Sequence, residues 1–225
     1  MEPLVQIPVA PGASFTLPPK LEGLRRLAYN LWWAWHPEAR TLFSRIDAGR
    51  WARFRNPIPL LAGNVNWAQL LDNPAFMAEY EEILREFDAY MANGSDHWFG
   101  RHHGEAFNGP IAYFCAEYGF HESLGIYSGG LGVLAGDHMK TASDMALPLV
   151  GVGLMYRRGF FRQAIDADGH QEHAYPDFEL SRLPILRAKD RLGRPLTVSI
   201  ELPGRELFAA VWVAQVGRVP VLLLD

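Results

Sequence analysis

The sequence predicts an α/β protein in which a helical N-terminal region precedes a region with a mixed, partly parallel sheet. Apolar residues recur with helical spacing between residues 20 and 92. Two apolar runs, at 111–115 and 149–155, flank a glycine-rich loop and another helical pattern at 131–146. Strand, loop, helix and strand in this order form a βαβ unit, so the two strands are expected to be parallel.

The N-terminal helical pattern is rich in leucine and tryptophan. One broad helical face over 20–36 carries Leu24, Leu27, Ala28, Leu31, Trp32 and Trp35. Trp32 and Trp35 are therefore predicted to be core residues and not sugar-stacking platforms, whereas Trp33 lies off this face. Pro37 ends the helix and can begin the next. Helices are also expected at 37–45, 51–54, 66–72 and 74–92, followed by a polar loop over 97–109.

In the second half of the chain, turn residues separate short apolar runs. Asp168-Gly169 predicts a hairpin turn. Later strands are expected at 196–201, 206–215 and 219–224. The last run is continuously apolar, as in a strand buried on both faces. No covering element follows it before Asp225, so it is either the last strand of a compact domain or the chain is a piece of a longer polypeptide. The second interpretation is favoured.

Composition excludes several classes of protein. The 225 residues carry a net charge of −4 and no basic stripe, which argues against nucleic-acid binding. Cys115 is the single cysteine, so no intrachain disulfide forms and a reducing, cytoplasmic location is expected. No apolar run is long enough for a membrane span, and the N-terminus does not resemble a signal peptide. His102, His103, His170 and His173 show no metal-ligand spacing, so no metal is assigned.

Glycines concentrate at Gly129, Gly130 and Gly132, directly before the predicted helix. Free N–H groups and the positive end of the helix dipole make such a junction a candidate anion site, and its position at the carboxyl end of a strand favours a phosphate. The alternative is a tight turn into a buried helix with no ligand.

Three segments resemble the α-glucan (glycogen/maltodextrin) phosphorylase family, in its shorter bacterial and archaeal form. They are Ile111–Phe120, Tyr127–Gly132 and Gly151–Gln163. Residues 20–100, with Asn30-Leu-Trp-Trp-Ala-Trp35 and Asn56-Pro57, are similar to the helical N-terminal region of these enzymes. The resemblance covers nearly the whole chain.

This resemblance implies two Rossmann-like domains around a cleft, the GT-B architecture. Residues 1–100 would be the helical N-terminal region, and 101–225 an incomplete N-terminal Rossmann-like domain. The implied reaction is phosphorolysis of an α-1,4-glucan by orthophosphate, giving glucose 1-phosphate. The lysine that holds pyridoxal phosphate would lie outside this chain and is not Lys20, Lys140 or Lys189. This fragment alone would then be inactive, with no catalytic residue of its own; a homo-oligomer is compatible with the resemblance.

Carried over residue by residue, the resemblance assigns the phosphate and sugar contacts to backbone N–H groups of Gly129, Gly130, Leu131 and Gly132. Glu117 matches a glutamate near the cofactor and phosphate, or it is a structural carboxylate that accepts loop N–H bonds. Many relatives have a tyrosine where this chain has Gly119; Tyr118 is the candidate substitute.

Charged residues follow on the helix and after the next strand. Asp137 and His138 are candidate substrate-binding residues, with Asp137 placed to bind a sugar hydroxyl and Lys140 an anion. The alternative is a helix surface of mixed charge. Arg157 and Arg158 are either a phosphate clamp or solvated charges.

Two other functions compete. A starch or glycogen synthase-like enzyme would use a sugar nucleotide, but such enzymes place Lys-Thr before the glycine loop, where this chain has Tyr127-Ser128. A non-catalytic glucan-binding module would use the tryptophans.

Overall fold

The computed structural model describes residues 7–9, 12, 15–92, 97–104, 109–175 and 177–225. Its helical elements are η1 (Pro19–Leu21), α1 (Gly23–Ala28), η2 (Leu31–Ala34), α2 (Pro37–Ile46), α3 (Ala48–Phe54), α4 (Pro57–Leu61), α5 (Trp67–Leu71), α6 (Pro74–Ala92), α7 (Trp98–His103), α8 (Gly130–Asp144) and η3 (Leu180–Arg182). Its strands are β1 (Ile111–Phe114), β2 (Leu149–Leu154), β3 (Arg162–Ile165), β4 (Gln171–Ala174), β5 (Leu186–Arg187), β6 (Thr197–Leu202), β7 (Arg205–Val216) and β8 (Val219–Leu224).

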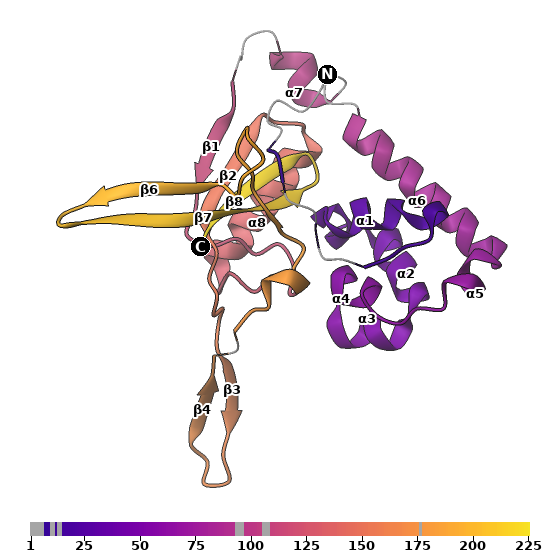
Figure 1. Ribbon diagram of the computed structural model, residues 1–225, viewed down its shortest axis with the longest axis horizontal. Helices are drawn as coiled ribbons and strands as arrows, with labels where there is room; N and C mark the ends of the chain where they lie inside the picture. Colours follow the sequence, from indigo (N-terminus) through magenta and orange to yellow (C-terminus); the bar gives the residue numbers. More distant parts are fainter. Residues whose placement is uncertain (1–6, 10–11, 13–14, 93–96, 105–108, 176) are drawn as a thin grey trace.

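The predicted α/β fold class is confirmed. The main sheet has the order β1-β2-β8-β7-β5, with β6 paired to β7. β1, β2 and β8 are parallel neighbours, whereas β8 and β7 are antiparallel. The helix α8 connects β1 to β2 and packs against β2 and β8, as expected for the βαβ unit. Figure 1 shows the helices α1 to α6 grouped on one side of this sheet and two hairpins, β3–β4 and β6–β7, projecting from it.

Side-chain caps and prolines define the short helices. His36, Asp47 and Asn56 each accept a hydrogen bond from a backbone N–H in the first turn of α2, α3 and α4. Proline occupies the first position of α2 and α4, where no intrahelical donor is needed. No helix was expected directly after Asn56-Pro57, but this pair begins α4. The helix α7 was not expected either, because it lies within the segment expected to be a polar loop.

The expected single helix over 20–36 is interrupted, which corrects that prediction. α1 ends at Ala28, and Asn30 adopts an extended conformation before η2. The Asn30 Oδ1 accepts hydrogen bonds from the backbone N–H groups of Trp32 and Gly217, at 3.0 and 2.9 Å, and its Nδ2 donates to the Gly217 carbonyl. This buried amide therefore fixes the β7–β8 turn against the helices. The interruption also rotates the following residues, so Trp33 is fully buried.

One core cluster spans the helices and the sheet. Its contents include the leucines of α1 and α2, Trp32 and Trp33, and the inner residues of β8. Arg218, at the β7–β8 turn, strengthens this junction. Its guanidinium donates to the carbonyls of Tyr90 and Ser143 and lies 3.8 Å from the centre of the Tyr90 ring. Helices and sheet are therefore joined by apolar packing and by a polar network.

Candidate functional site

The glycine loop leads directly into α8. Gly129 is the N-cap and has a φ of 72°, a left-handed value that favours glycine. Gly129, Gly130 and Leu131 are exposed, and the backbone N–H groups of these three residues donate to no group in the described part of the chain. The loop thus presents three consecutive free donors at the positive end of a helix of 15 residues.

Glu117 holds this loop in place. Its Oε1 accepts a hydrogen bond from the Gly132 N–H at 2.8 Å, and its Oε2 accepts one from the Ser128 N–H at 2.9 Å. The carboxylate therefore makes the loop bonds that the structural alternative expects of it. It also engages the Gly132 N–H, which leaves Gly129, Gly130 and Leu131 as the open donors.

The glycines of this segment serve different physical purposes. Gly119 donates its N–H to the Gly132 carbonyl at 2.7 Å, and a Cβ added to Gly136 would lie 2.1 Å from the Gly119 carbonyl oxygen. A Cβ on Gly132 would meet the Tyr127 Cβ at 2.5 Å. Gly130 is different, because an added Cβ would have no atom within 4 Å. Close packing therefore requires glycine at positions 132 and 136. It is tight at Gly119, whose added Cβ would lie 3.0 Å from the Gly132 carbonyl oxygen, whereas the space around Gly130 is open.

Close packing also bears on Gly119, the position at which the resemblance implies a tyrosine. Tyr118 does not replace that side chain. It is fully buried, and its hydroxyl donates to the Tyr113 carbonyl at 2.7 Å. Burial raises the pKa of the Tyr118 phenol above its ordinary value. The suggested substitution by Tyr118 is therefore wrong.

The charged residues of α8 lie beyond the loop. Asp137 and His138 are exposed, and the His138 ring lies 4.8 Å from the Tyr113 ring. Lys140 is partly buried, and its Nζ is 3.9 Å from an Asp137 oxygen. Burial lowers the pKa of Lys140. The buried face of α8 consists of Gly132, Ala135, Gly136, Met139, Ala142 and Ser143. Leu131 and Leu134 belong to the apolar helical pattern at 131–146, but both are exposed.

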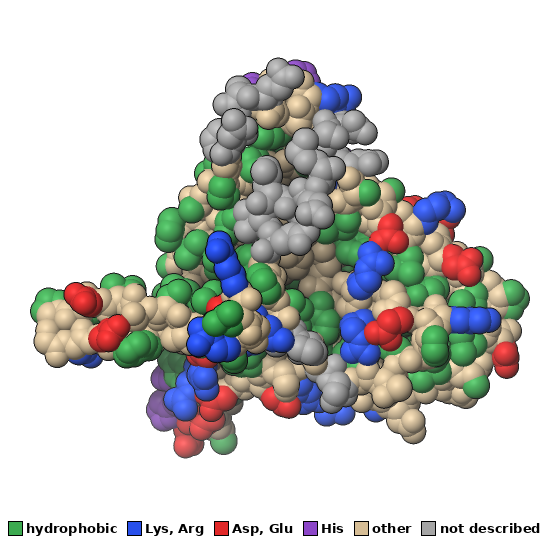
Figure 2. Space-filling view, turned by 45° about the horizontal axis from the view of Figure 1, so that its top comes forward, with side chains coloured by type: hydrophobic (Ala, Val, Ile, Leu, Met, Phe, Trp, Pro, Cys, Tyr) green, Lys and Arg blue, Asp and Glu red, His purple; other side chains and the backbone are tan. Residues whose placement is uncertain are grey.

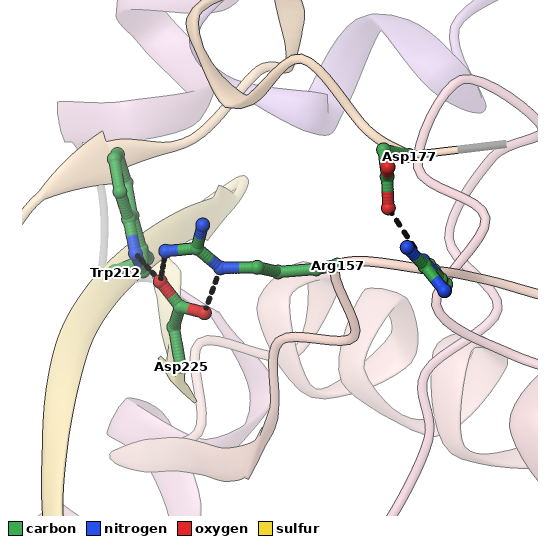
Figure 3. Close-up of polar contacts among 5 residues, drawn as sticks. Arg157, Asp177, Trp212 and Asp225 are labelled. Atoms are coloured by element: carbon green, nitrogen blue, oxygen red, sulfur yellow. Dashed lines mark hydrogen bonds and ion pairs between the residues drawn. The ribbon is translucent and has the colours of Figure 1, made fainter.

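Arg157 and Arg158 are both paired with carboxylates. Figure 3 shows the Arg157 guanidinium directed at Asp225, which also faces Trp212. Its Nε and Nη2 donate to the two Asp225 oxygens at 2.8 and 2.9 Å. The Arg158 Nε donates to Asp177 at 2.7 Å. These arginines therefore do not form the suggested phosphate clamp in this structure.

Oxygen and nitrogen ligands come together at the tip of the β3–β4 hairpin. Ligand atoms of Asp166, Asp168 and His170 lie within 4.8 Å of one another. Asp166 Oδ1 accepts the N–H groups of Asp168 and His170, which accounts for its position by the turn alone. We assign no metal to this exposed group.

The sequence did not indicate that several cationic side chains act on His121. Burial and the charges of Arg40, Lys140 and Arg55 lower the pKa of the His121 imidazole to about 4. The four residues belong to separate elements, so no sequence spacing could have indicated their proximity.

The chain is similar in sequence to known proteins over most of its length. A family described as proteins of unknown function, DUF3417, matches residues 17–124. The maltodextrin phosphorylase of Thermococcus litoralis is 40% identical over 93% of this chain and 25% of its own length. The glycogen phosphorylase of Mycobacterium tuberculosis is 41% identical over 93% of the chain and 25% of its own length. The resemblance to the α-glucan phosphorylase family is confirmed.

A third phosphorylase matches over the same extent. The glycogen phosphorylase of Aquifex aeolicus is 36% identical over 91% of this chain and 29% of its own length. The chain thus spans about a quarter of the length of the curated relatives that it matches. Within the described residues, no helix has the length and apolar character of a membrane span.

Proposed function

We propose that this chain is the N-terminal part of an α-glucan phosphorylase, which releases glucose 1-phosphate from α-1,4-glucans with orthophosphate. The observation that carries the proposal is identity of 36–41% to phosphorylases over more than nine-tenths of the chain. The open N–H groups of the glycine loop support it. We also propose the division into a helical region, 1–100, and an incomplete Rossmann-like domain, 101–225, of a GT-B enzyme.

In this proposal, the chain contributes preorganised donors. The N–H groups of Gly129, Gly130 and Leu131 donate to the phosphate and sugar in the cleft, and no side chain must reorganise for them to do so. Glu117 positions the loop by binding Ser128 and Gly132. Asp137 and His138, on the exposed side of α8, are proposed to contact sugar hydroxyls.

The cofactor would be held elsewhere in the full-length protein. Lys140 is packed beside Asp137 on α8 and is not in a cofactor motif. Tyr118 is turned into the core, so the residues next to Glu117 offer the cofactor ring no aromatic partner from this position. We propose that pyridoxal phosphate, bound by a lysine outside this chain, supplies a phosphate group as proton donor or relay. The chain itself would then contain no catalytic residue.

Specific observations weigh against the alternative functions. A glucan-binding module that stacks sugars on Trp32 and Trp33 would need those rings at the surface, but they are 3% and 0% exposed. A sugar-nucleotide transferase is disfavoured because the loop is preceded by Tyr127-Ser128 in place of Lys-Thr.

The experiment is an assay of the full-length polypeptide beside the 225-residue chain. With maltodextrin, orthophosphate and pyridoxal phosphate, the full-length protein should release glucose 1-phosphate and the chain should release none. Transfer from a sugar nucleotide by the full-length protein, without phosphorolysis, would favour the synthase. Robust turnover by the chain, purified from a host without phosphorylase, would contradict the assignment of the cofactor lysine.

A further inference from the structure

The segment that carries Glu117 is tied to the sheet on both sides by tyrosine hydroxyls. Tyr156, which lies just after β2, donates its hydroxyl to the Ala116 carbonyl at 3.0 Å. On the other side of the glutamate, Tyr118 is buried and donates its hydroxyl to the Tyr113 carbonyl at 2.7 Å. Both residues that flank Glu117 in the sequence are therefore held, one through its carbonyl and the other through its side chain.

Tyr156 itself lies in a backbone segment whose position is fixed. The Met155 N–H donates to the carbonyl of the last residue of β8 at 2.7 Å, and the Arg157 carbonyl accepts the Phe178 N–H at 2.8 Å. The Arg157 guanidinium also binds both carboxylate oxygens of Asp225, as Figure 3 shows. Because the backbone is bonded on both sides of Tyr156, its ring can serve as a firm attachment for the loop after β1.

Glu117 links this attachment to the glycine loop. Its two carboxylate oxygens accept the N–H groups of Ser128 and Gly132, at 2.9 and 2.8 Å. The carboxylate can make both bonds only while its backbone keeps it at the right distance and angle, because hydrogen bonds weaken steeply when their geometry is poor. A continuous series of contacts therefore runs from Tyr156 through Ala116 and Glu117 to the loop that precedes α8.

We propose that Tyr156 is a positioning residue for the anion site at the start of α8. Its hydroxyl holds the Ala116 carbonyl, so that Glu117 keeps the loop in the conformation that leaves the three N–H groups open. Preorganised donors need no rearrangement when a ligand binds. A loop that loses this support must be ordered again on binding, which lowers affinity. The identity of the ligand rests on the proposed function, whereas the contacts that carry the inference do not.

The first test measures amide hydrogen exchange by NMR in Tyr156→Phe and in the parent chain. The substitution removes only the hydroxyl oxygen of a residue that is 37% exposed, so the variant should stay folded. Without that bond, the amides of Ser128 and Gly132 should exchange about fivefold faster, which is the effect of losing one ordinary hydrogen bond. Tyr175→Phe is the matched control, since Tyr175 is 54% exposed and its hydroxyl makes no hydrogen bond to a described residue.

The second test is kinetic and uses the full-length protein. With orthophosphate varied, Tyr156→Phe should raise the KM for orthophosphate about fivefold and change the KM for maltodextrin less. A purely structural role would instead reduce the amount of folded enzyme, which lowers the apparent kcat and leaves both KM values where they were. Tyr175→Phe should keep the kinetic constants of the parent.

Glu117→Gln shows whether Tyr156 acts through the carboxylate, because glutamine has only one acceptor oxygen in its side chain. If it does, adding Tyr156→Phe to Glu117→Gln should accelerate amide exchange little further. Unchanged exchange at Ser128 and Gly132 in Tyr156→Phe, or full additivity of the two substitutions, would overturn the proposal. Failure of the full-length parent to phosphorolyse maltodextrin would contradict the proposed function alone, since the exchange measurement still decides the role of Tyr156.

Discussion

The helices around Trp33 and the β6–β7 hairpin are both rich in apolar side chains, but only the helices bury them. Trp33 is fully buried and contacts Phe43 and Trp51, with ring centroids 6.2 and 5.9 Å away. All six residues of β6 are exposed, and Phe208 of β7 is 63% exposed. Figure 2 shows hydrophobic side chains along this projecting arm.

The two regions differ in what covers their apolar side chains. The helices α1 to α6 pack against one another and share one core cluster with the sheet. The outer hairpin has only its own pairing, in a register from Thr197 with Ala210 to Leu202 with Arg205. Two strands alone are marginally stable in water. In the β6–β7 hairpin, backbone hydrogen bonds therefore pair the two strands, but few side chains are buried.

Truncation of one aromatic residue in each region gives the largest expected contrast. Trp33→Ala removes a fully buried ring and should lower the free energy of unfolding by about 3–5 kcal/mol. Phe208→Ala removes a ring that is 63% exposed and should change it by less than about 0.5 kcal/mol. Urea unfolding followed by circular dichroism would measure both. Equal losses in the two variants would show that the arm is buried in solution.

The sequence predicted those parts of the fold that depend on local pattern. The helix α6 and the parallel pair β1 and β2 follow from apolar spacing and from a crossover helix. The interruption at Asn30 could not be predicted, because its cause is Gly217, which lies far away in the sequence. The exposure of Leu131 and Leu134 was missed for a related reason. Gly132 and Gly136 permit closer packing than leucine does, and they turn the opposite face of α8 inward.

The candidate site was predicted in part. The glycine loop was identified from composition, and Glu117 from the resemblance. Which N–H groups remain open depends on how the Glu117 carboxylate folds back over the loop, and spacing alone does not encode this. The charges that lower the pKa of His121 come from residues on separate elements, and a single sequence does not reveal this.

Acidification should produce a smaller loss of stability, which arises from His121 in the loop after β1. Burial and nearby cations keep His121 neutral in the folded chain down to a pKa of about 4, whereas the ordinary value is 6.5. The unfolded chain therefore binds a proton first, and stability falls as the pH drops from about 6.5 towards about 4.

The variant His121→Gln should lose less stability than the parent over this pH range, by about 1–2 kcal/mol. Guanidinium unfolding in a buffer without phosphate would measure the difference. His170→Gln is the control, since it replaces an exposed histidine at the β3–β4 turn. A parallel pH dependence in His121→Gln and the parent would show that His121 titrates normally.

The most direct test of the account concerns Gly130, because its backbone N–H is open and the space around it is empty. Gly130→Val should leave the stability of the chain nearly unchanged, since an added Cβ meets no atom within 4 Å. In the full-length protein, the same change should reduce phosphorolysis by about 10²–10³, as expected when a preorganised donor is blocked. Thr141→Val, at an exposed position of α8, should alter neither property. Full phosphorolysis by a folded Gly130→Val enzyme would show that the loop is only a turn and would contradict its proposed role in binding phosphate.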